Sequence, residues 1–128
     1  MEFHYPALSD LDVFVRIWPG DGNLVGADAR LDDQPITLDV AGTVLRGRIG
    51  LGKEVRKLLQ IAATLQRVNQ HGDFATIELE LFQQLPKDAP PLPGLPANSE
   101  FNNKRFPLLR SEFGQQNELR ILQTVRII

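Results

Sequence analysis

The sequence contains no cysteine, only two histidines, and one residue each of methionine, tryptophan and tyrosine. Without cysteine there can be no disulfide framework, no thiolate metal site and no cysteine nucleophile. The two histidines, His4 and His71, do not fit the usual spacings of zinc ligands. The sequence therefore predicts no metal site, no cofactor and no catalytic residue, and we expect a protein that is not an enzyme.

Long hydrophobic runs are also missing. No stretch approaches the roughly 18 apolar residues that a membrane helix needs. The first residues include Glu2, Asp10 and Asp12 rather than the basic start of a signal peptide. We expect a cytoplasmic protein without membrane contact.

A chain of 128 residues that is 42% hydrophobic and 23% charged is expected to form a single domain over residues 1–128.

The charge is small in total but unevenly distributed. The net charge of −2 combines a strongly acidic segment over residues 1–45, a basic segment over residues 46–72 and a nearly neutral remainder. Such a split can attract two parts of one fold to each other, or it can steer an oppositely charged partner to the surface. The residues alone leave both interpretations open.

Alternation of apolar and polar residues predicts strands in six places. These segments are residues 11–18, 24–31, 36–40, 45–51, 74–82 and 118–128. The third and fourth segments could form a hairpin, or one long strand bent at Gly42 by a bulge.

One amphipathic helix is predicted from Lys53 to about Gln70. Its apolar stripe at helical spacing consists of Val55, Leu58, Leu59, Ala62, Leu65 and Val68. Gly72 follows at a position suited to a left-handed C-cap. The glycines of residues 47–52 precede this helix as in a phosphate-binding loop, but the Gly-Lys-Ser/Thr ending is absent. An anion held by the helix dipole at Gly52 and Lys53 is the most that this pattern supports.

Residues 86–117 form a long connection before the last predicted strand. Five of the nine prolines lie between Pro86 and Pro96, which favours polyproline II and excludes a central strand or a helix. The phenylalanines that follow need something to cover them. We interpret the segment as an arm that wraps its own domain or a neighbouring subunit. Its predicted partner-binding residues are Pro90, Pro91, Pro93, Phe101, Phe106 and Phe113.

These elements predict an α+β fold. We expect a small twisted antiparallel sheet or partly open barrel of five to six strands, with one amphipathic helix and the proline-rich connection before the last strand. If the third and fourth strands are one bent strand, the order matches that of an OB-type barrel. This analogy concerns architecture and carries no function by itself.

Two functions are consistent with these features. The first is a non-enzymatic protein–protein interaction or assembly subunit, expected to be oligomeric, that uses the charge-segregated surfaces and the proline-rich arm. The alternative is an OB-like single-stranded nucleic-acid binder, because bases stack on aromatic rings while cations follow the phosphates. Its predicted contacts are Phe14, Arg16 and Trp18 on one strand and Arg46 and Arg48 on another.

Simpler interpretations exist for the same residues. Phe14 and Trp18 could lie beneath the predicted helix or the proline-rich arm while Arg16 pairs with an aspartate, and the negative net charge favours this view. Glu78 and Glu80 share one side of a strand, where a carboxylate pair could form. Ordinary strand patterning favours the other explanation, that both are outward positions of an exposed sheet face.

Overall fold

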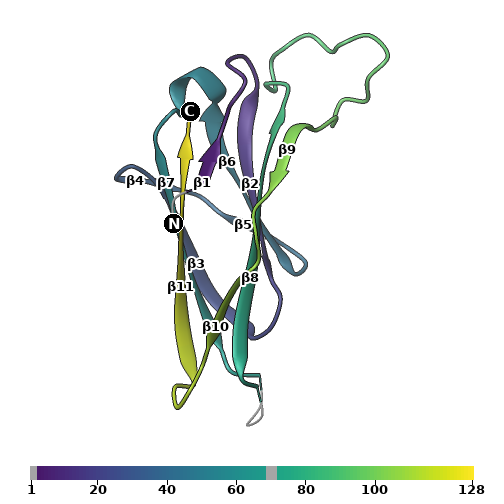
Figure 1. Cartoon of the computed structure of the whole chain (residues 1–128). Coiled ribbons are helices and arrows are strands. Elements are labelled where there is room, and N and C mark those ends of the chain that lie inside the picture. The colour runs from purple at the N-terminus through teal and green to yellow at the C-terminus, as the bar shows by residue number, and fades with distance from the viewer. Residues whose placement is uncertain (1–2, 69–71) are drawn as a thin grey trace.

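The computed structural model describes residues 3–68 and 72–128, and it consists of two facing β-sheets (Figure 1). The first sheet has the strand order β1-β11-β7-β3-β4, and the second has the order β10-β8-β2-β6-β5, with β9 also paired to β8. The strands are β1 (Phe3–Tyr5), β2 (Asp12–Pro19), β3 (Asn23–Leu31), β4 (Gln34–Ile36), β5 (Asp39–Ala41), β6 (Val44–Leu51), β7 (Leu58–Gln66), β8 (Phe74–Gln84), β9 (Phe101–Arg105), β10 (Leu109–Glu112) and β11 (Glu118–Ile127).

The core lies between the two sheets and comes from alternate residues of the long strands. Val13, Val15 and Ile17 of β2 pack in one cluster with Leu59 and Ile61 of β7. Alternation places every second side chain of a strand on the same face. The intervening residues of β2 therefore point away from the core, and they form part of the outer face of the second sheet.

The predicted α+β class is wrong, because the structure is all-β. In the described residues the only helical segment is a three-residue 3-10 turn, η1 (Gly52–Glu54). The segment predicted as the amphipathic helix instead forms β7. No helix in the described part of the chain is long and apolar enough to cross a membrane.

The helix prediction failed because the apolar residues of 58–66 fit both the helical repeat and the two-residue repeat of a strand. Leu59, Ile61, Ala63 and Leu65 are all buried, which is the pattern of a strand with one face on the core. Leu58 and Ala62, which the helical stripe would have buried, are only partly covered. Because β7 is paired along its length with both β3 and β11, the ladders on its two sides outweigh the local helical preference.

Loss of the helix also removes the features predicted at its ends. A single 3-10 turn has no helix dipole of consequence, so Gly52 and Lys53 provide no anion site of the kind expected. Gly52 serves packing instead, since a Cβ atom there would collide with the backbone carbonyl of Leu8. His71, expected after the helix, lies outside the described residues.

The third and fourth predicted strands are resolved as a hairpin, preceded by a separate short strand. β5 and β6 pair antiparallel around a turn in which Gly42 has a φ of 66°, a left-handed conformation that suits glycine. β4 pairs with β3 in the other sheet. The OB-type strand order is therefore also wrong, since it requires one bent strand followed by a helix.

The connection over residues 86–117 contains two strands that the sequence did not predict. β9 and β10 both pair antiparallel with β8, end to end along the same edge. The longest section without a strand runs from Leu85 to Glu100, and it projects from the top of the molecule between β8 and β9 (Figure 1). We call residues 85–100 the proline-rich loop.

Candidate functional site

The outer face of the second sheet brings together the residues that the sequence proposed for nucleic-acid contact. Register places Arg16 beside Arg46 of β6 and beside Glu80 of β8. It also places Phe14 opposite Arg48 and Phe82. Trp18 lies opposite Glu78. The five predicted residues thus do share one face.

The aromatic rings on this face are covered by guanidinium groups. Phe14 and Phe82 stack with their centroids 5.4 Å apart. The Arg16 guanidinium lies 3.9 Å from the Phe82 centroid, and that of Arg46 lies 4.7 Å from the Phe14 centroid. Phe82 is fully buried as a result. A base could stack on Phe82 only after displacing these arginines.

Carboxylates neutralise most of the arginines on the same face. Arg16 contacts Glu80 at 2.7 Å and Glu100 at 2.6 Å. Arg48 donates two hydrogen bonds to Asp12, of 3.0 and 2.9 Å, which raise the pKa of its guanidinium. These pairs agree with the simpler interpretation of Arg16, except that its partners are glutamates.

The Glu78 and Glu80 carboxylates belong to the same ion-pair network. Arg105 of β9 approaches Glu78 at 3.3 Å and Glu80 at 3.5 Å. Glu80 is buried beneath its two arginine partners. Both carboxylates therefore have cationic partners, and this geometry provides no free acid–base pair.

This network also attaches the proline-rich loop to the sheet. Glu100, at the end of the loop, accepts two hydrogen bonds from Arg16, of 3.0 and 2.6 Å. The Gln84 side chain donates to the backbone oxygen of Asn98 at 3.3 Å and accepts from Arg46 at 3.0 Å. The C-terminal end of the loop is thereby held against β2 and β8, and its N-terminal end continues directly from β8.

The attachment leads to a pH prediction for Glu100. The hydrogen bond from Arg16 lowers the pKa of Glu100 below its ordinary value of 4.5. A carboxyl group whose pKa is lower in the folded state than in the unfolded state stabilises the fold at pH values above its unfolded-state pKa. This stabilisation is lost as the pH falls through the folded-state pKa. We expect Glu100→Gln to remove that part of the acid sensitivity, worth under about 1 kcal/mol because the pair is partly exposed.

Urea denaturation of the wild type and Glu100→Gln between pH 7 and pH 3 measures this difference. Glu112→Gln is the control, since Glu112 is an exposed carboxylate on β10. A stability difference between wild type and Glu100→Gln that stays constant over this pH range would contradict the prediction.

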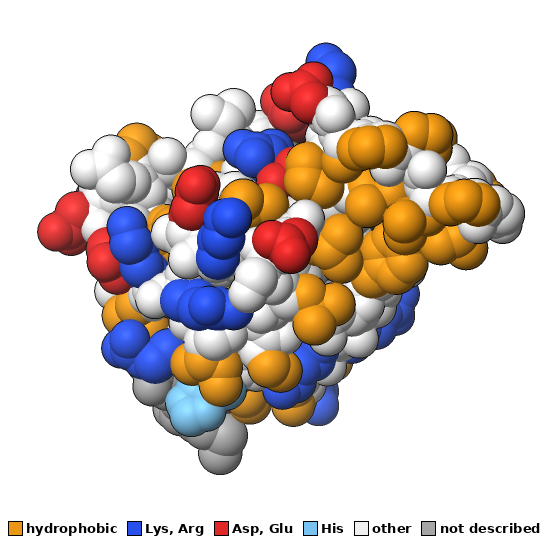
Figure 2. All heavy atoms as spheres, turned by 90° about the horizontal axis from the view of Figure 1, so that it is seen from above, with side chains coloured by type: hydrophobic (Ala, Val, Ile, Leu, Met, Phe, Trp, Pro, Cys, Tyr) orange, Lys and Arg blue, Asp and Glu red, His pale blue; other side chains and the backbone are white. Residues whose placement is uncertain are grey.

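The middle of the loop is the most exposed apolar part of this region. Pro90, Pro91 and Pro93 are exposed, and Leu92 and Leu95 each retain 44% of their accessible surface. Figure 2 shows hydrophobic side chains gathered on the side of the molecule where Figure 1 places the loop. Three backbone hydrogen bonds between residues three apart, such as Leu95 N–H to Leu92 O at 3.3 Å, divide the loop into turns.

A hollow of about 810 Å³ lies beneath the loop. Its floor is formed by Phe14, Arg48 and Gln84 of the sheet, and its walls come from loop residues that include Leu92 and Leu95. The loop is therefore connected to the aromatic and arginine face, rather than standing apart from it.

The three phenylalanines of the predicted arm do not lie on this surface. Phe106 and Phe113 are 3% and 2% exposed and belong to the core, and Phe106 contacts the Phe3 ring with centroids 5.4 Å apart. Phe101 is half-buried in β9. Of the alternatives considered for the arm, residues 101–113 therefore wrap their own domain, and the prolines remain as candidate partner contacts.

Sequence reasoning missed Phe82, Gln84, Glu100 and Arg105 as members of this face. The alternation in residues 74–82 places Phe82 on the same side as Glu78 and Glu80, and this pattern could have identified Phe82 as a residue of the outer face. Nothing in the sequence indicated that β8 would lie between β2 and β9. In the described ranges, no cluster of histidine, aspartate and glutamate could hold a metal ion.

Comparison with known proteins adds no assignment: no family model, no curated protein and no solved structure matches this chain.

Proposed function

We propose that this protein is a non-enzymatic protein–protein interaction or assembly subunit, and that the proline-rich loop is its docking surface. The observation that carries the proposal is an apolar loop whose C-terminal end is held by side-chain contacts and whose N-terminal end continues from β8. Its exposed centre consists of Pro90, Pro91, Leu92, Pro93 and Leu95. Restraint of the loop before binding reduces the conformational entropy that is lost when a partner binds.

The chemistry of the loop favours a protein as the partner. Proline-rich segments dock in grooves lined with aromatic side chains and lose little entropy on binding. Lys87 is exposed three residues before Pro90, so a groove with an acidic rim would fit this loop best. The partner is either another protein or a second copy of this chain, and a cytoplasmic location remains a prediction from composition.

The nucleic-acid alternative has less support. Arg16, Arg46, Arg48 and Arg105 are matched in number by Asp12, Glu78, Glu80 and Glu100 on the same face. A face without excess positive charge gains little from phosphate neutralisation, which supplies most of the non-specific affinity for nucleic acids.

Replacing both Leu92 and Leu95 with serine tests the docking surface. We expect the double variant to lose the complex or oligomer formed by the wild type, as measured by size-exclusion light scattering over a concentration series. We expect its free energy of unfolding to change by less than about 0.5 kcal/mol, because the loop contains no core residue.

Leu122→Ser is the matched control, since Leu122 is 68% exposed on β11 of the other sheet. A mass unaffected by the loop substitutions would contradict the proposal, as would a wild type that stays monomeric and forms no complex. Fluorescence anisotropy with labelled oligothymidine tests the alternative, which predicts binding that weakens steeply in Trp18→Ala and Arg46→Ala.

A further inference from the structure

One side of β11 is a strand edge at the margin of the first sheet. β7 pairs with β11 from Glu118 to Arg126, whereas β1 covers the other side of β11 only from Val125 to Ile127. In residues 3–68 and 72–128, the stretch 118–124 therefore has a ladder partner on one side only. The backbone groups along such an edge can pair with another strand.

The pairing with β7 determines which backbone groups this edge presents. Ile127 donates its N–H to the backbone oxygen of Lys57 at 2.9 Å, and the ladder between the two strands has no register shift. Odd-numbered residues of β11 therefore bond toward β7. The N–H and C=O groups of the even-numbered residues Glu118, Arg120 and Leu122 point to the free edge.

Two opposite charges lie close together on this edge. Glu118 and Arg120 are both exposed on the outer face of the strand, opposite the neutral residues Gln66 and Thr64 of β7. Within the described ranges, neither takes part in an ion pair. The edge thus carries one negative and one positive charge that a neighbouring strand could neutralise.

The same edge of a second copy would match both charges in one register. In a two-fold antiparallel pair centred on Leu119, Glu118 of each copy lies opposite Arg120 of the partner subunit. The two neighbouring two-fold registers are disfavoured, because they place Glu118 opposite Glu118 or Arg120 opposite Arg120. The matching register also uses the backbone groups that point to the free edge, since both members of each ion pair are even-numbered.

Leu119 adds an apolar contact at the centre of this pair. Its side chain is half-buried and packs against the core cluster that contains Phe113 and Ile121. In the two-fold pair, the Leu119 side chains of the two copies lie opposite each other on the core-facing side. Each copy therefore covers the exposed margin of the other copy's core.

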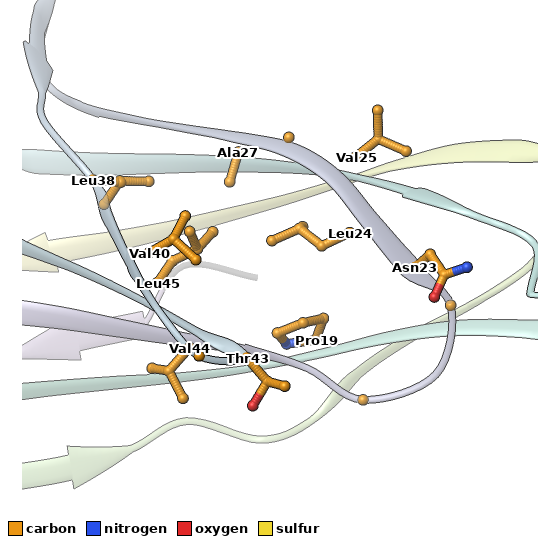
Figure 3. A pocket seen from close by; sticks show the side chains of 14 residues that line it. Pro19, Asn23, Leu24, Val25, Ala27, Leu38, Val40, Thr43, Val44 and Leu45 are labelled. Carbon is orange, nitrogen blue, oxygen red and sulfur yellow. The ribbon is translucent and has the colours of Figure 1, made fainter.

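The open edge of β3 offers no comparable selectivity. β4 covers this edge only from Ala29 to Leu31, and the uncovered part borders an apolar hollow of about 580 Å³ that Leu24 and Val40 help to line (Figure 3). None of the residues that line this hollow carries a charge. The hollow therefore does not distinguish one partner from another, whereas the charges of β11 do.

We propose that two copies of this chain associate through residues 117–121 of the β11 edge, which joins their first sheets into one continuous sheet. Leu122 follows the paired stretch and is not part of it. β11 begins at the end of the molecule opposite the proline-rich loop (Figure 1), so this association does not depend on the proposed function of the loop. A subunit with both surfaces can link dimers into a larger assembly.

Charge reversal tests the proposed register. Glu118→Arg and Arg120→Glu should each raise the dissociation constant of the dimer about tenfold or more, because two attractive pairs become two repulsive ones. The double variant that combines both reversals should dimerise like the wild type. So should Asp33→Arg, which reverses an exposed charge in the turn between β3 and β4 at the opposite margin of the sheet. Sedimentation equilibrium of the full chain at low salt measures these constants.

An equal mixture of the two single variants provides the strictest test. Each variant alone would bring like charges together, whereas the mixed dimer restores both ion pairs, so the dimer mass should return when the variants are combined. Hydrogen exchange followed by NMR locates the contact. With rising protein concentration the amides of Glu118 and Arg120 should become protected, while those of Leu119 and Ile121, which already bond to β7, should not change.

Three results would overturn the proposal. These are a wild type that stays monomeric at millimolar concentration, a dimer that is insensitive to both single reversals, and a mixture of variants that does not regain the dimer mass. Protection of the Glu118 and Arg120 amides only after another protein is added would also overturn it, because that protein would then be the occupant. Leu92→Ser, Leu95→Ser should keep this dimer, and Glu118→Arg should keep the loop-dependent complex, so this proposal and the proposed function fail separately.

Discussion

Replacing Ala63 with lysine should destabilise the protein severely, whereas the same replacement at Ala62 should be tolerated. Ala63 is fully buried in β7 among the residues of a core cluster that includes Leu65 and Ile77. A lysine there would bring an unpaired ammonium group into the core, which costs several kcal/mol, and would also overpack the site. We expect a loss of at least about 3 kcal/mol, a large share of the total stability of a small domain.

Ala62 lies one residue earlier, on the outer face of the same strand. It is partly exposed and lies opposite Asp28 of β3, so a lysine there gains a carboxylate neighbour. We expect a change within about 1 kcal/mol. The helical pattern assigned Ala62 to the core, so the pair of variants distinguishes a strand from a helix at these positions.

Chemical denaturation followed by the fluorescence of Trp18, the single tryptophan, measures both variants. If Ala63→Lys does not fold, Ala63→Val should show a smaller loss in the same direction. A larger loss at Ala62 than at Ala63 would contradict the orientation of β7.

Replacing Gln83 with alanine should cost about 3 kcal/mol, although glutamine is usually a surface residue. Gln83 is fully buried, and its Oε1 accepts hydrogen bonds of 2.8 Å from both the Leu8 N–H and the Asn102 side chain. Its Nε2 donates to the backbone oxygens of Leu8 and Leu11 at 2.9 and 3.1 Å. Removal of the amide leaves several partly buried groups without partners, at about 1–3 kcal/mol for each fully buried one.

The expected consequence is local as well as global. The segment between β1 and β2 should loosen, so the amide of Leu8 should exchange with solvent faster in Gln83→Ala than the lower stability alone explains. Gln84→Ala is the matched control, because Gln84 bonds to Arg46 and Asn98 at the surface, and its loss should cost about 0.5 kcal/mol. Equal effects of the two variants in urea denaturation would refute this role for Gln83.

Much of the β-rich character could be predicted from alternation. β2, β3, β6, β8 and β11 form close to the predicted segments, because each has one face on the core and one toward solvent. Strict alternation through residues 24–31 would place Val25 on the inward face with Ala27, Ala29 and Leu31. Val25 is instead 58% exposed, because the bulge at this point shifts the alternation by one residue. A bulge is set by the pairing with β7, and the local sequence does not reveal it.

The candidate surfaces were predictable only in part. Phe14, Arg16 and Trp18 were correctly placed together because they alternate on one strand. Their partners Glu80 and Glu100 lie 64 and 84 residues away in sequence from Arg16, so only the strand order brings them into contact.

By itself, the sequence determined the absence of thiol chemistry, the positions of the five strands β2, β3, β6, β8 and β11, and the irregular path of the proline-rich loop. These are local properties, set by residue chemistry, by alternation and by the fixed backbone of proline. The tertiary structure decided that residues 58–66 are a strand, that Phe106 and Phe113 are core residues, and that the arginines of the outer face are paired. Each of these depends on which strands become neighbours, because long-range pairing outweighs a local preference that is compatible with two structures.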